Sequence, residues 1–335
     1  MNKKALLLVN LGSPDNPSFL AVAKYLKYFL NEGRVIDLHP VLRFFLVHFI
    51  IIPFRTFKAV NMYRKIWEPD GSPLLKYSND LKNKLEKELP ADTDVYLAMR
   101  YGNPGLKKCL KELEMKKYGY IKIVPLFPQY ASSTSGSIID KTLKLISRWN
   151  FIPDIHVISS FFDKSPYIQS MATLLSRSVN KSSHQHIVFS FHSIPLNHVA
   201  RSHQDRDCPE NDCQHELNND NVTCYKATCY ATARMISQAA GIKENDFTVT
   251  FQSRFGRKWL GPFTKDVIKT LPGNGIRNIV VISPSFVTDC LETIIELGQD
   301  YRDLFIANGG KSYVLVESLN DNDEWVKGLA DITGS

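Results

Sequence analysis

Short apolar runs alternate with helix-length segments along almost the whole chain, and this alternation constrains the fold more than any other feature. Each run is bounded by turn residues, which is typical of strands buried on both faces of a parallel sheet. The predicted strands are residues 5–11, 95–99, 121–127, 187–191, 247–251 and 279–283. The predicted helices between them include residues 77–88, 104–117, 138–149 and 165–180. The sequence therefore predicts an α/β protein with parallel sheets.

A weak internal repeat indicates that the chain holds two similar halves. The segment LLLVNLGSP at 6–14 resembles IVFSFHSIP at 187–195, and two further pairs of segments follow in the same order: 99–104 with 253–258, and 121–127 with 278–284. A length of 335 residues also suits about two domains. Ligands of open parallel sheets bind outside the carboxyl ends of the strands. We therefore expect the residues that follow the strands to face a cleft: 12–13, 100–101, 192–193, 254 and 283–285.

The charge and composition of the chain limit the classes of ligand that it can bind and the cellular location that we expect. The net charge of +7 and the pI near 8.9 favour acidic small molecules or a membrane surface, and they do not require nucleic acid. The chain has no phosphate-binding loop of the G-x-x-x-x-G-K-[ST] type, which disfavours nucleotide chemistry. The apolar run 44–54 is shorter than the roughly 20 residues of a spanning helix. No export signal is recognised at the start, so we predict a cytoplasmic protein.

The segment 283–301 carries four acids, Asp289, Glu292, Glu296 and Asp300. On an α-helix these positions fall within an arc of about 80°. The arrangement fits either an ordinary solvated face or a carboxylate track for a hard cation or for protons, because clustered acids raise one another's pKa. His192 follows a predicted strand directly. It is either a strand-end histidine with satisfied hydrogen bonds or a general base.

Two further segments have open interpretations. Residues 37–57 are apolar and aromatic, as in a buried core helix or in a lip that rests in a membrane surface and admits an apolar ligand. Cys208, Cys213, Cys224 and Cys229 form a C-x4-C-x10-C-x4-C set. Four thiolates suit zinc or an iron–sulfur cluster, and disulfides are disfavoured without export.

Together, the motifs resemble those of the ferrochelatases, the terminal enzymes of heme synthesis, over nearly the full chain. They are LLVNLGSP at 7–14, YRKIWEPDGSPL at 63–74, MRYGNP at 99–104, PLFPQYASSTSGS at 125–137, FSFHSIP at 189–195, QSRFGRKWLGP at 252–262, SPSFVTDCLETIIELG at 283–298 and ESLND at 317–321. The resemblance implies two Rossmann-like, chelatase-like domains with four-stranded parallel sheets, related by internal duplication.

The resemblance also implies domain bounds. The first domain covers residues 1–165 and includes a membrane and porphyrin lip near 38–57. The second covers residues 166–320 and includes a cysteine insert at 201–230. Residues 321–335 form a C-terminal helix that packs back on the core.

The resemblance implies that the chain inserts Fe²⁺ into protoporphyrin IX to give protoheme, with loss of two protons. By the family pattern, His192 is the active-site histidine, Glu292 is its acidic partner, and Asp289 is a further catalytic acid on the same acidic path. His192, Glu292, Glu296 and Asp300 are expected to bind Fe²⁺ or to carry protons, and His192 either binds iron, accepts protons or does both. The porphyrin-pocket positions are Tyr63, Arg100, Tyr101, Ser133 and Trp259. A cobalt chelatase, a coproporphyrin-specific enzyme and a non-catalytic porphyrin carrier remain alternatives.

The resemblance leaves the metal sites partly open. Cys290 stands where some relatives have histidine. Some bacterial relatives carry a [2Fe-2S] cluster on an internal cysteine segment, so Cys208, Cys213, Cys224 and Cys229 are its expected ligands, with zinc or no metal as alternatives. The expected partners are protoporphyrin IX, Fe²⁺ and membrane lipid at the inner face of the cytoplasmic membrane. The chain is expected to be a monomer or a homodimer.

Overall fold

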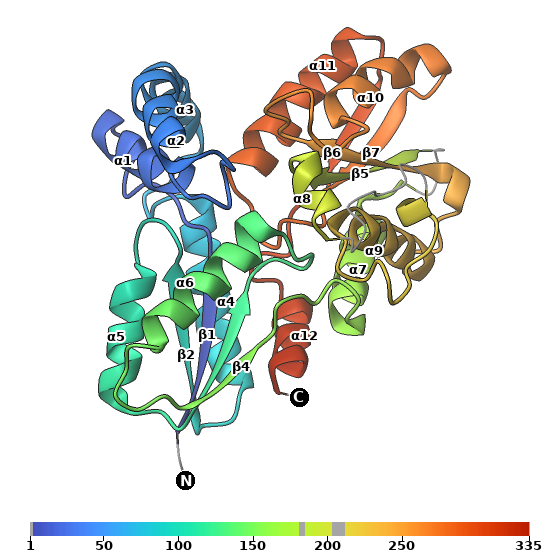
Figure 1. The fold of residues 1–335 in the computed structure, drawn as a ribbon. Coiled ribbons are helices and arrows are strands. Elements are labelled where there is room, and N and C mark those ends of the chain that lie inside the picture. Colours follow the sequence, from blue (N-terminus) through green and yellow to red (C-terminus); the bar gives the residue numbers. More distant parts are fainter. Residues whose placement is uncertain (1–2, 181–184, 203–211, 335) are drawn as a thin grey trace. The chain divides into compact units, whose positions relative to one another are not determined.

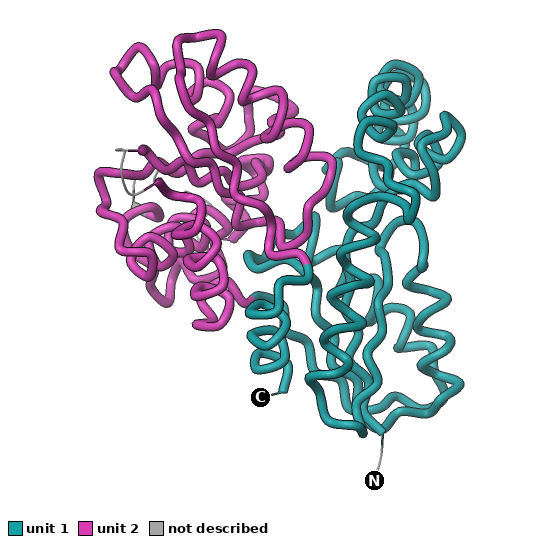
Figure 2. The backbone as a smooth tube through the Cα atoms, turned by 180° about the vertical axis from the view of Figure 1, so that it is seen from behind, with its two compact units in different colours: residues 1–160, 321–335 teal, residues 161–320 magenta. Residues whose placement is uncertain are grey.

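The computed structural model describes residues 3–180, 185–202 and 212–334. The chain divides into two compact units, which Figure 2 shows in different colours. Unit 1 comprises Met1–Ser160 and Asp321–Ser335, and unit 2 comprises Phe161–Asn320. The C-terminal segment thus belongs to the same unit as the N-terminus.

Unit 1 is built on a parallel sheet with the strand order β2-β1-β3-β4. The strands are β1 (Lys4–Asn10), β2 (Thr93–Met99), β3 (Tyr120–Pro125) and β4 (Asp154–Val157). Leu7, Val9 and Ile123 of this sheet pack with α5 (Leu106–Lys116) and α6 (Ser137–Ile146), because those helices turn apolar stripes to the sheet.

The C-terminal helix α12 (Asp323–Gly334) packs against α4 (Pro73–Glu88) in unit 1. Trp325 and Leu329 of α12 are fully buried. The Lys122 ammonium on β3 donates a hydrogen bond to the Thr333 carbonyl at 2.6 Å. The last residues of the chain therefore complete the core of unit 1.

A separate group of helices at one end of unit 1 contains α1 (Phe19–Leu30) and a continuous helix from Pro40 to Ile66 (Figure 1). This long helix is made of α2 (Pro40–Phe45), a π-helical stretch (Leu46–Ile51) and α3 (Ile52–Ile66). By length and apolar composition it is the one helix in the described chain that could cross a membrane, although only 17% of its most apolar window is buried. Its buried residues Val47 and Ile51 pack on Leu30 of α1.

Unit 2 repeats the architecture, with the strand order β6-β5-β7-β8 and all strands parallel. The strands are β5 (His186–His192), β6 (Phe247–Gln252), β7 (Asn278–Ile282) and β8 (Ser312–Leu315). The flanking helices are α7 (Ser165–Ser178), α8 (Leu196–Ala200), α9 (Tyr225–Ala239), α10 (Thr264–Thr270), a π-helix (Glu292–Tyr301) and α11 (Arg302–Ala307). The π-helix, α10 and α11 pack on one face of the sheet, and α7 packs with α9 (Figure 1).

The predicted fold class is confirmed: both sheets are parallel, four-stranded and arranged in the same order. All six predicted strands exist, with small shifts at their ends. The short strands β4 and β8 escaped sequence analysis because none of their residues is fully buried, so they lack a continuous apolar signal.

The prediction that all four acids share one α-helix is wrong. Asp289 precedes the helix, and Glu292, Glu296 and Asp300 lie on a π-helix that runs from Glu292 to Tyr301. In a π-helix the hydrogen bonds run from residue i to i+5, so the three acids, four residues apart, remain on one side. Asp289 lies outside the π-helix because its carboxylate is hydrogen-bonded to Ser318 and Asn320, as described below.

Candidate active site

The candidate site of unit 2 lies at the carboxyl ends of three neighbouring strands, β6, β5 and β7. His192 is the last residue of β5, Ser253 follows β6, and Ser283–Ser285 follow β7. Because the strands are parallel and neighbours in the order β6-β5-β7, these ends meet at the same edge of the sheet. The fold thus places His192 at the position where such sheets bind ligands.

The imidazole of half-buried His192 has a defined tautomer. Its Nδ1 lies 2.6 Å from the carbonyl oxygen of Ser193. A carbonyl oxygen can only accept a hydrogen bond, so Nδ1 must carry the proton. In the neutral ring the Nε2 atom therefore holds the lone pair, and Nε2 is the atom that can take a proton or bind a metal ion.

Glu296 is held in place by three donors. The main-chain N–H of Ser253 donates to one carboxylate oxygen at 3.0 Å, and the Ser253 hydroxyl donates to the other oxygen in a short hydrogen bond. The Tyr301 hydroxyl donates at 2.5 Å. Ser253 has a φ of 61°, a left-handed conformation that is uncommon outside glycine. The two hydrogen bonds to Glu296 offset the cost of this backbone conformation.

Asp289 is bound by the loop that ends unit 2. Its carboxylate accepts hydrogen bonds from the Asn320 amide at 2.7 Å and from the Thr293 hydroxyl at 2.9 Å, with longer contacts of 3.4 Å from the Ser318 N–H. The same Thr293 hydroxyl accepts from the N–H of Cys290. Asp289 therefore anchors the start of the π-helix to residues 318–320.

Glu292 and Asp300 stand at opposite ends of the π-helix. Glu292 is half-buried and hydrogen-bonded to the buried thiol of Cys290, whose pKa is raised mainly by burial. Asp300 is exposed. In the described chain, none of the four acids forms a salt bridge with lysine or arginine. The helix therefore presents carboxylates that are not neutralised by basic side chains.

Trp259 lies on the loop that joins β6 to α10. The loop is tied to the residues after His192 by a bridge between Pro195 and Trp259 and by the Leu260 N–H, which donates to the Ile194 carbonyl at 2.9 Å. The Trp259 ring faces the exposed ring of Phe255, with 6.4 Å between centroids. The bridge thus places Trp259 beside Pro195, which follows His192 by three residues.

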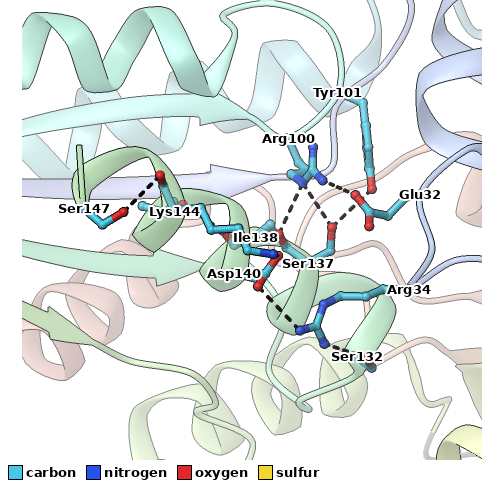
Figure 3. Close-up of polar contacts among 11 residues, drawn as sticks. Glu32, Arg34, Arg100, Tyr101, Ser132, Ser137, Ile138, Asp140, Lys144 and Ser147 are labelled. Carbon is cyan, nitrogen blue, oxygen red and sulfur yellow. Dashed lines mark hydrogen bonds and ion pairs between the residues drawn. The ribbon is translucent and has the colours of Figure 1, made fainter. Parts of the chain in front are cut away.

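In unit 1, Arg100 and Tyr101 follow β2 and form a compact polar cluster, shown in Figure 3. The Arg100 Nε donates to the Ser137 hydroxyl at 3.0 Å, and its terminal nitrogen forms a short ion pair with Glu32. The guanidinium also lies 4.5 Å from the ring centre of Tyr101. Burial raises the pKa of Tyr101 to about 12, so its hydroxyl stays protonated near neutral pH.

A second cation of the same region is Arg34. It donates to the Ser132 hydroxyl at 3.0 Å and lies 3.7 Å from Asp140 (Figure 3). Ser132 begins a π-helical turn, Ser132–Gly136, and half-buried Ser133 is the next residue of this turn. Two arginines, each balanced by one acid, thus flank the turn that carries Ser133.

Tyr63 lies on α3 and is buried, with 7% of its surface exposed. Its ring packs edge-on against Tyr25 of α1 and against Trp67. Tyr25 in turn donates a hydrogen bond to the carbonyl of Gly12, the residue after β1. These contacts connect Tyr63 to the strand ends of unit 1.

Cys208 lies outside the described residues, and the other three cysteines of the set are buried. Burial raises the pKa of Cys224 and of Cys229, and Cys213 adds to the increase at Cys224 as Cys224 does at Cys229. Over residues 3–180, 185–202 and 212–334, no three His, Cys, Asp or Glu side chains are gathered so that they could hold a metal ion. The described thiols are therefore not arranged as a ligand set.

Sequence analysis missed several residues that shape these sites. Glu32, Ser137 and Ser253 hold Arg100 or Glu296, and Tyr225 binds the main chain of His192. Ser253 could have been found from its place directly after a strand. Glu32 and Tyr225 carry no comparable signal, because each meets its partner only through the tertiary fold.

Comparison with known proteins gives a consistent result over the whole chain. A family model described as Ferrochelatase matches residues 3–335. Proteins named ferrochelatase from Legionella pneumophila strains Lens and Paris are 39% identical over 331 residues, covering 98% of both chains. A ferrochelatase from Coxiella burnetii strain Dugway 5J108-111 is 38% identical over 332 residues, covering 98% of this chain and 92% of the relative.

Solved structures agree on the fold. SirB from Bacillus subtilis with Fe³⁺ matches with a TM-score of 0.55 and 11% identity, covering 99% of this chain and 94% of SirB. The sirohydrochlorin chelatase SirB in complex with cobalt matches with a TM-score of 0.54, also at 11% identity, covering 98% and 93%. At this level of identity the match shows a shared chelatase-like fold and nothing further.

Proposed function

The chain belongs to the ferrochelatase family, and we propose from this that it inserts Fe²⁺ into protoporphyrin IX, releasing two protons and giving protoheme. It is accordingly a lyase of heme biosynthesis. The observation that carries the proposal is the family match over residues 3–335, together with a histidine of defined tautomer at the end of β5.

We propose that His192 accepts the pyrrole protons at Nε2. The hydrogen bond from Nδ1 to the Ser193 carbonyl directs the lone pair to Nε2 and stabilises the imidazolium that forms on protonation. Two protons leave each porphyrin, so His192 must pass the first on before it accepts the second. A route for protons next to the base is therefore needed.

We propose that the π-helix supplies this route, or the path by which Fe²⁺ arrives. Glu292 has more remaining acceptor capacity than Glu296: in the described chain only the Cys290 thiol is hydrogen-bonded to Glu292, whereas Glu296 already accepts from three donors. Carboxylate oxygens suit Fe²⁺ without binding it as tightly as thiolates do. Glu296 and exposed Asp300 continue the row toward solvent, and Asp289 fixes its inner end.

We propose that Arg100, Tyr101, Tyr63 and Ser133 of unit 1 contact the porphyrin. Trp259, on unit 2, is proposed separately as a porphyrin contact. Arginine pairs well with carboxylates, and aromatic rings stack on a flat macrocycle. Binding that bends the macrocycle would expose its nitrogen lone pairs to the metal.

The test is metal insertion under anaerobic conditions, followed by the absorbance change of protoporphyrin IX with Fe²⁺. His192→Ala is expected to abolish turnover while leaving porphyrin binding, measured by fluorescence quenching, largely intact. His156→Ala is the matched control, because His156 is an exposed strand histidine of unit 1. Full activity in His192→Ala would exclude the proposed base.

We also propose that the enzyme rests on the inner face of the cytoplasmic membrane through the helix Pro40–Ile66. The exposed apolar side chains of this helix include Phe45, Phe49 and Phe54. Its other face packs on α1 through Val47 and Ile51. A helix with one face held by protein lies in the membrane surface and does not span the bilayer. The arginines and lysines of α3 favour binding to anionic lipid headgroups.

Flotation with vesicles of phosphatidylcholine and phosphatidylglycerol tests this proposal. The triple variant Phe45→Ser, Phe49→Ser, Phe54→Ser is expected to bind vesicles more than tenfold more weakly. A tenfold loss corresponds to about 1.4 kcal/mol, and the loss of three aromatic rings buried in the lipid exceeds that free energy. Phe151→Ser is the control, since Phe151 of unit 1 is as exposed as Phe49, at 65% against 64%. Equal binding by the triple variant and the wild type would contradict the proposal.

The cysteine segment carries a separate proposal, a [2Fe-2S] cluster on Cys208, Cys213, Cys224 and Cys229. Support comes from the spacing and from the shared burial of the three described thiols. Their described arrangement is not a ligand set, so no step of metal insertion is assigned to the group.

Iron and sulfide analysis of anaerobically purified protein tests the cluster. Roughly two iron and two sulfide per chain are expected for a [2Fe-2S] group. One zinc without sulfide, or no metal at all, would show that the cluster proposal is wrong.

A further inference from the structure

The main chain of His192 is held by an unusual set of side chains. Its N–H donates to the Ser285 hydroxyl at 3.1 Å, and its carbonyl oxygen accepts from the Tyr225 hydroxyl at 2.9 Å. Its Nδ1 bonds the Ser193 carbonyl. Both main-chain groups of this strand-end residue are thus bound by side chains from distant segments.

Tyr225 and Ser285 are themselves hydrogen-bonded to each other. The Ser285 hydroxyl accepts from the N–H of His192, so its own proton points to the Tyr225 oxygen. The Tyr225 proton in turn points to the His192 carbonyl. The three residues therefore form a closed ring of hydrogen bonds around the main chain of His192.

Tyr225 is well placed to keep this ring rigid. It is the first residue of α9, directly after Cys224, and only 6% of its surface is exposed. The buried Cys229 thiol lies next to this hydroxyl. A buried hydroxyl with several partners has one low-energy orientation.

The ring fixes more than the carbonyl it touches. The His192 carbonyl and the Ser193 N–H belong to one planar peptide unit. Tyr225 binds this unit on the oxygen side, and the Gln252 carbonyl accepts from the Ser193 N–H on the other side at 2.8 Å. With both ends bound, this plane cannot rotate, so the Ser193 Cα is held in place. The Ser193 carbonyl that receives the Nδ1 proton starts the next peptide and extends from this fixed atom.

We propose that Tyr225 is a positioning residue for metal insertion: its hydroxyl fixes the His192–Ser193 peptide and thereby the tautomer and orientation of the His192 imidazole. The proposal rests on the proposed role of His192. Outer hydrogen bonds of this kind orient functional histidines, and their loss commonly costs about 10–100-fold in activity. Tyr225 acts through His192 and does not contact the substrate.

Tyr225→Phe tests this role because it removes only the hydroxyl. The kcat for Fe²⁺ insertion is expected to fall by roughly 10–100-fold, with the KM for protoporphyrin IX unchanged. Tyr118→Phe is the matched control, since Tyr118 is an equally buried, hydrogen-bonded tyrosine of unit 1. Its kcat is expected to equal that of the wild type. An unchanged kcat in Tyr225→Phe would overturn the proposal, as would an equal fall of kcat in Tyr118→Phe.

A spectroscopic measurement separates this proposal from the proposed function. Imidazole ¹⁵N NMR is expected to show a protonated Nδ1 for His192 in the wild type, with the signal assigned from His192→Gln. In Tyr225→Phe the signal is expected to shift or broaden toward a tautomer mixture. An unchanged signal would refute the positioning role even if iron insertion is confirmed. Failure of the wild type to insert iron would refute the function and leave the NMR result standing.

Discussion

Replacing Asp289 by asparagine distinguishes an anchoring role from a catalytic one. The Asp289 carboxylate accepts two strong hydrogen bonds, from Asn320 and Thr293. Asparagine keeps one acceptor oxygen, but its amide group turns donor hydrogens toward the second donor. One hydrogen bond is lost, and two donors then face each other at the start of the π-helix.

The expected loss of stability follows from these contacts. A hydrogen bond to a charged group contributes about 1.5–3 kcal/mol, so we expect Asp289→Asn to lower the free energy of unfolding by about 2–3 kcal/mol. In a domain of this size, 1 kcal/mol corresponds to roughly 2–4 °C in Tm. The Tm of unit 2 should therefore fall by roughly 4–12 °C.

The assay compares Asp289→Asn with Glu292→Gln by circular dichroism melting and by iron insertion per folded molecule. Asp289→Asn should melt earlier and keep most of its activity. Glu292→Gln should melt near the wild type and lose most of its turnover, because Glu292 is bound only by Cys290 in the described chain. A stable but inactive Asp289→Asn enzyme would refute the anchoring argument.

Three further predictions concern unit 1. Trp325→Ala should destabilise the chain by about 3–5 kcal/mol in urea unfolding, because this side chain is fully buried in the C-terminal helix; an unchanged midpoint would argue against that packing. Arg100→Lys should raise the KM for protoporphyrin, because lysine cannot bond Ser137 and Glu32 through a planar fork; an unchanged KM would remove Arg100 from the pocket. The folded-state pKa of Tyr101 is raised to about 12, so the unfolded chain loses this proton first and stability should fall between about pH 10 and 12. Tyr101→Phe should show a smaller decline in denaturation midpoints over that range, and an identical decline would contradict the assignment.

Much of the fold could be predicted from the sequence. The six strands that carry continuous apolar runs were found, because burial on both faces of a parallel sheet requires such runs. The position of His192 at a strand end followed directly from the same pattern. The strands β4 and β8 could not be predicted, because their half-exposed residues lack that signal.

The candidate site was only partly predictable. The row of acids was read as one α-helix, because spacings of three and four residues fit α-helical periodicity. The π-helical geometry and the separation of Asp289 depend on Asn320 and Ser318, about 30 residues further along the chain. No local pattern contains that information.

The sequence alone determined which segments must be buried and which polar residues follow the buried strands, because hydrophobic patterning acts over neighbouring residues. Only the tertiary structure decided which hydrogen-bond partner each functional group receives. Tyr225 reaches His192 across 33 positions in the chain, and Glu296 meets Ser253 across 43. Such contacts are set by the packing of complete elements, so the partners of the His192 main chain and of individual acids emerge only once the chain is folded.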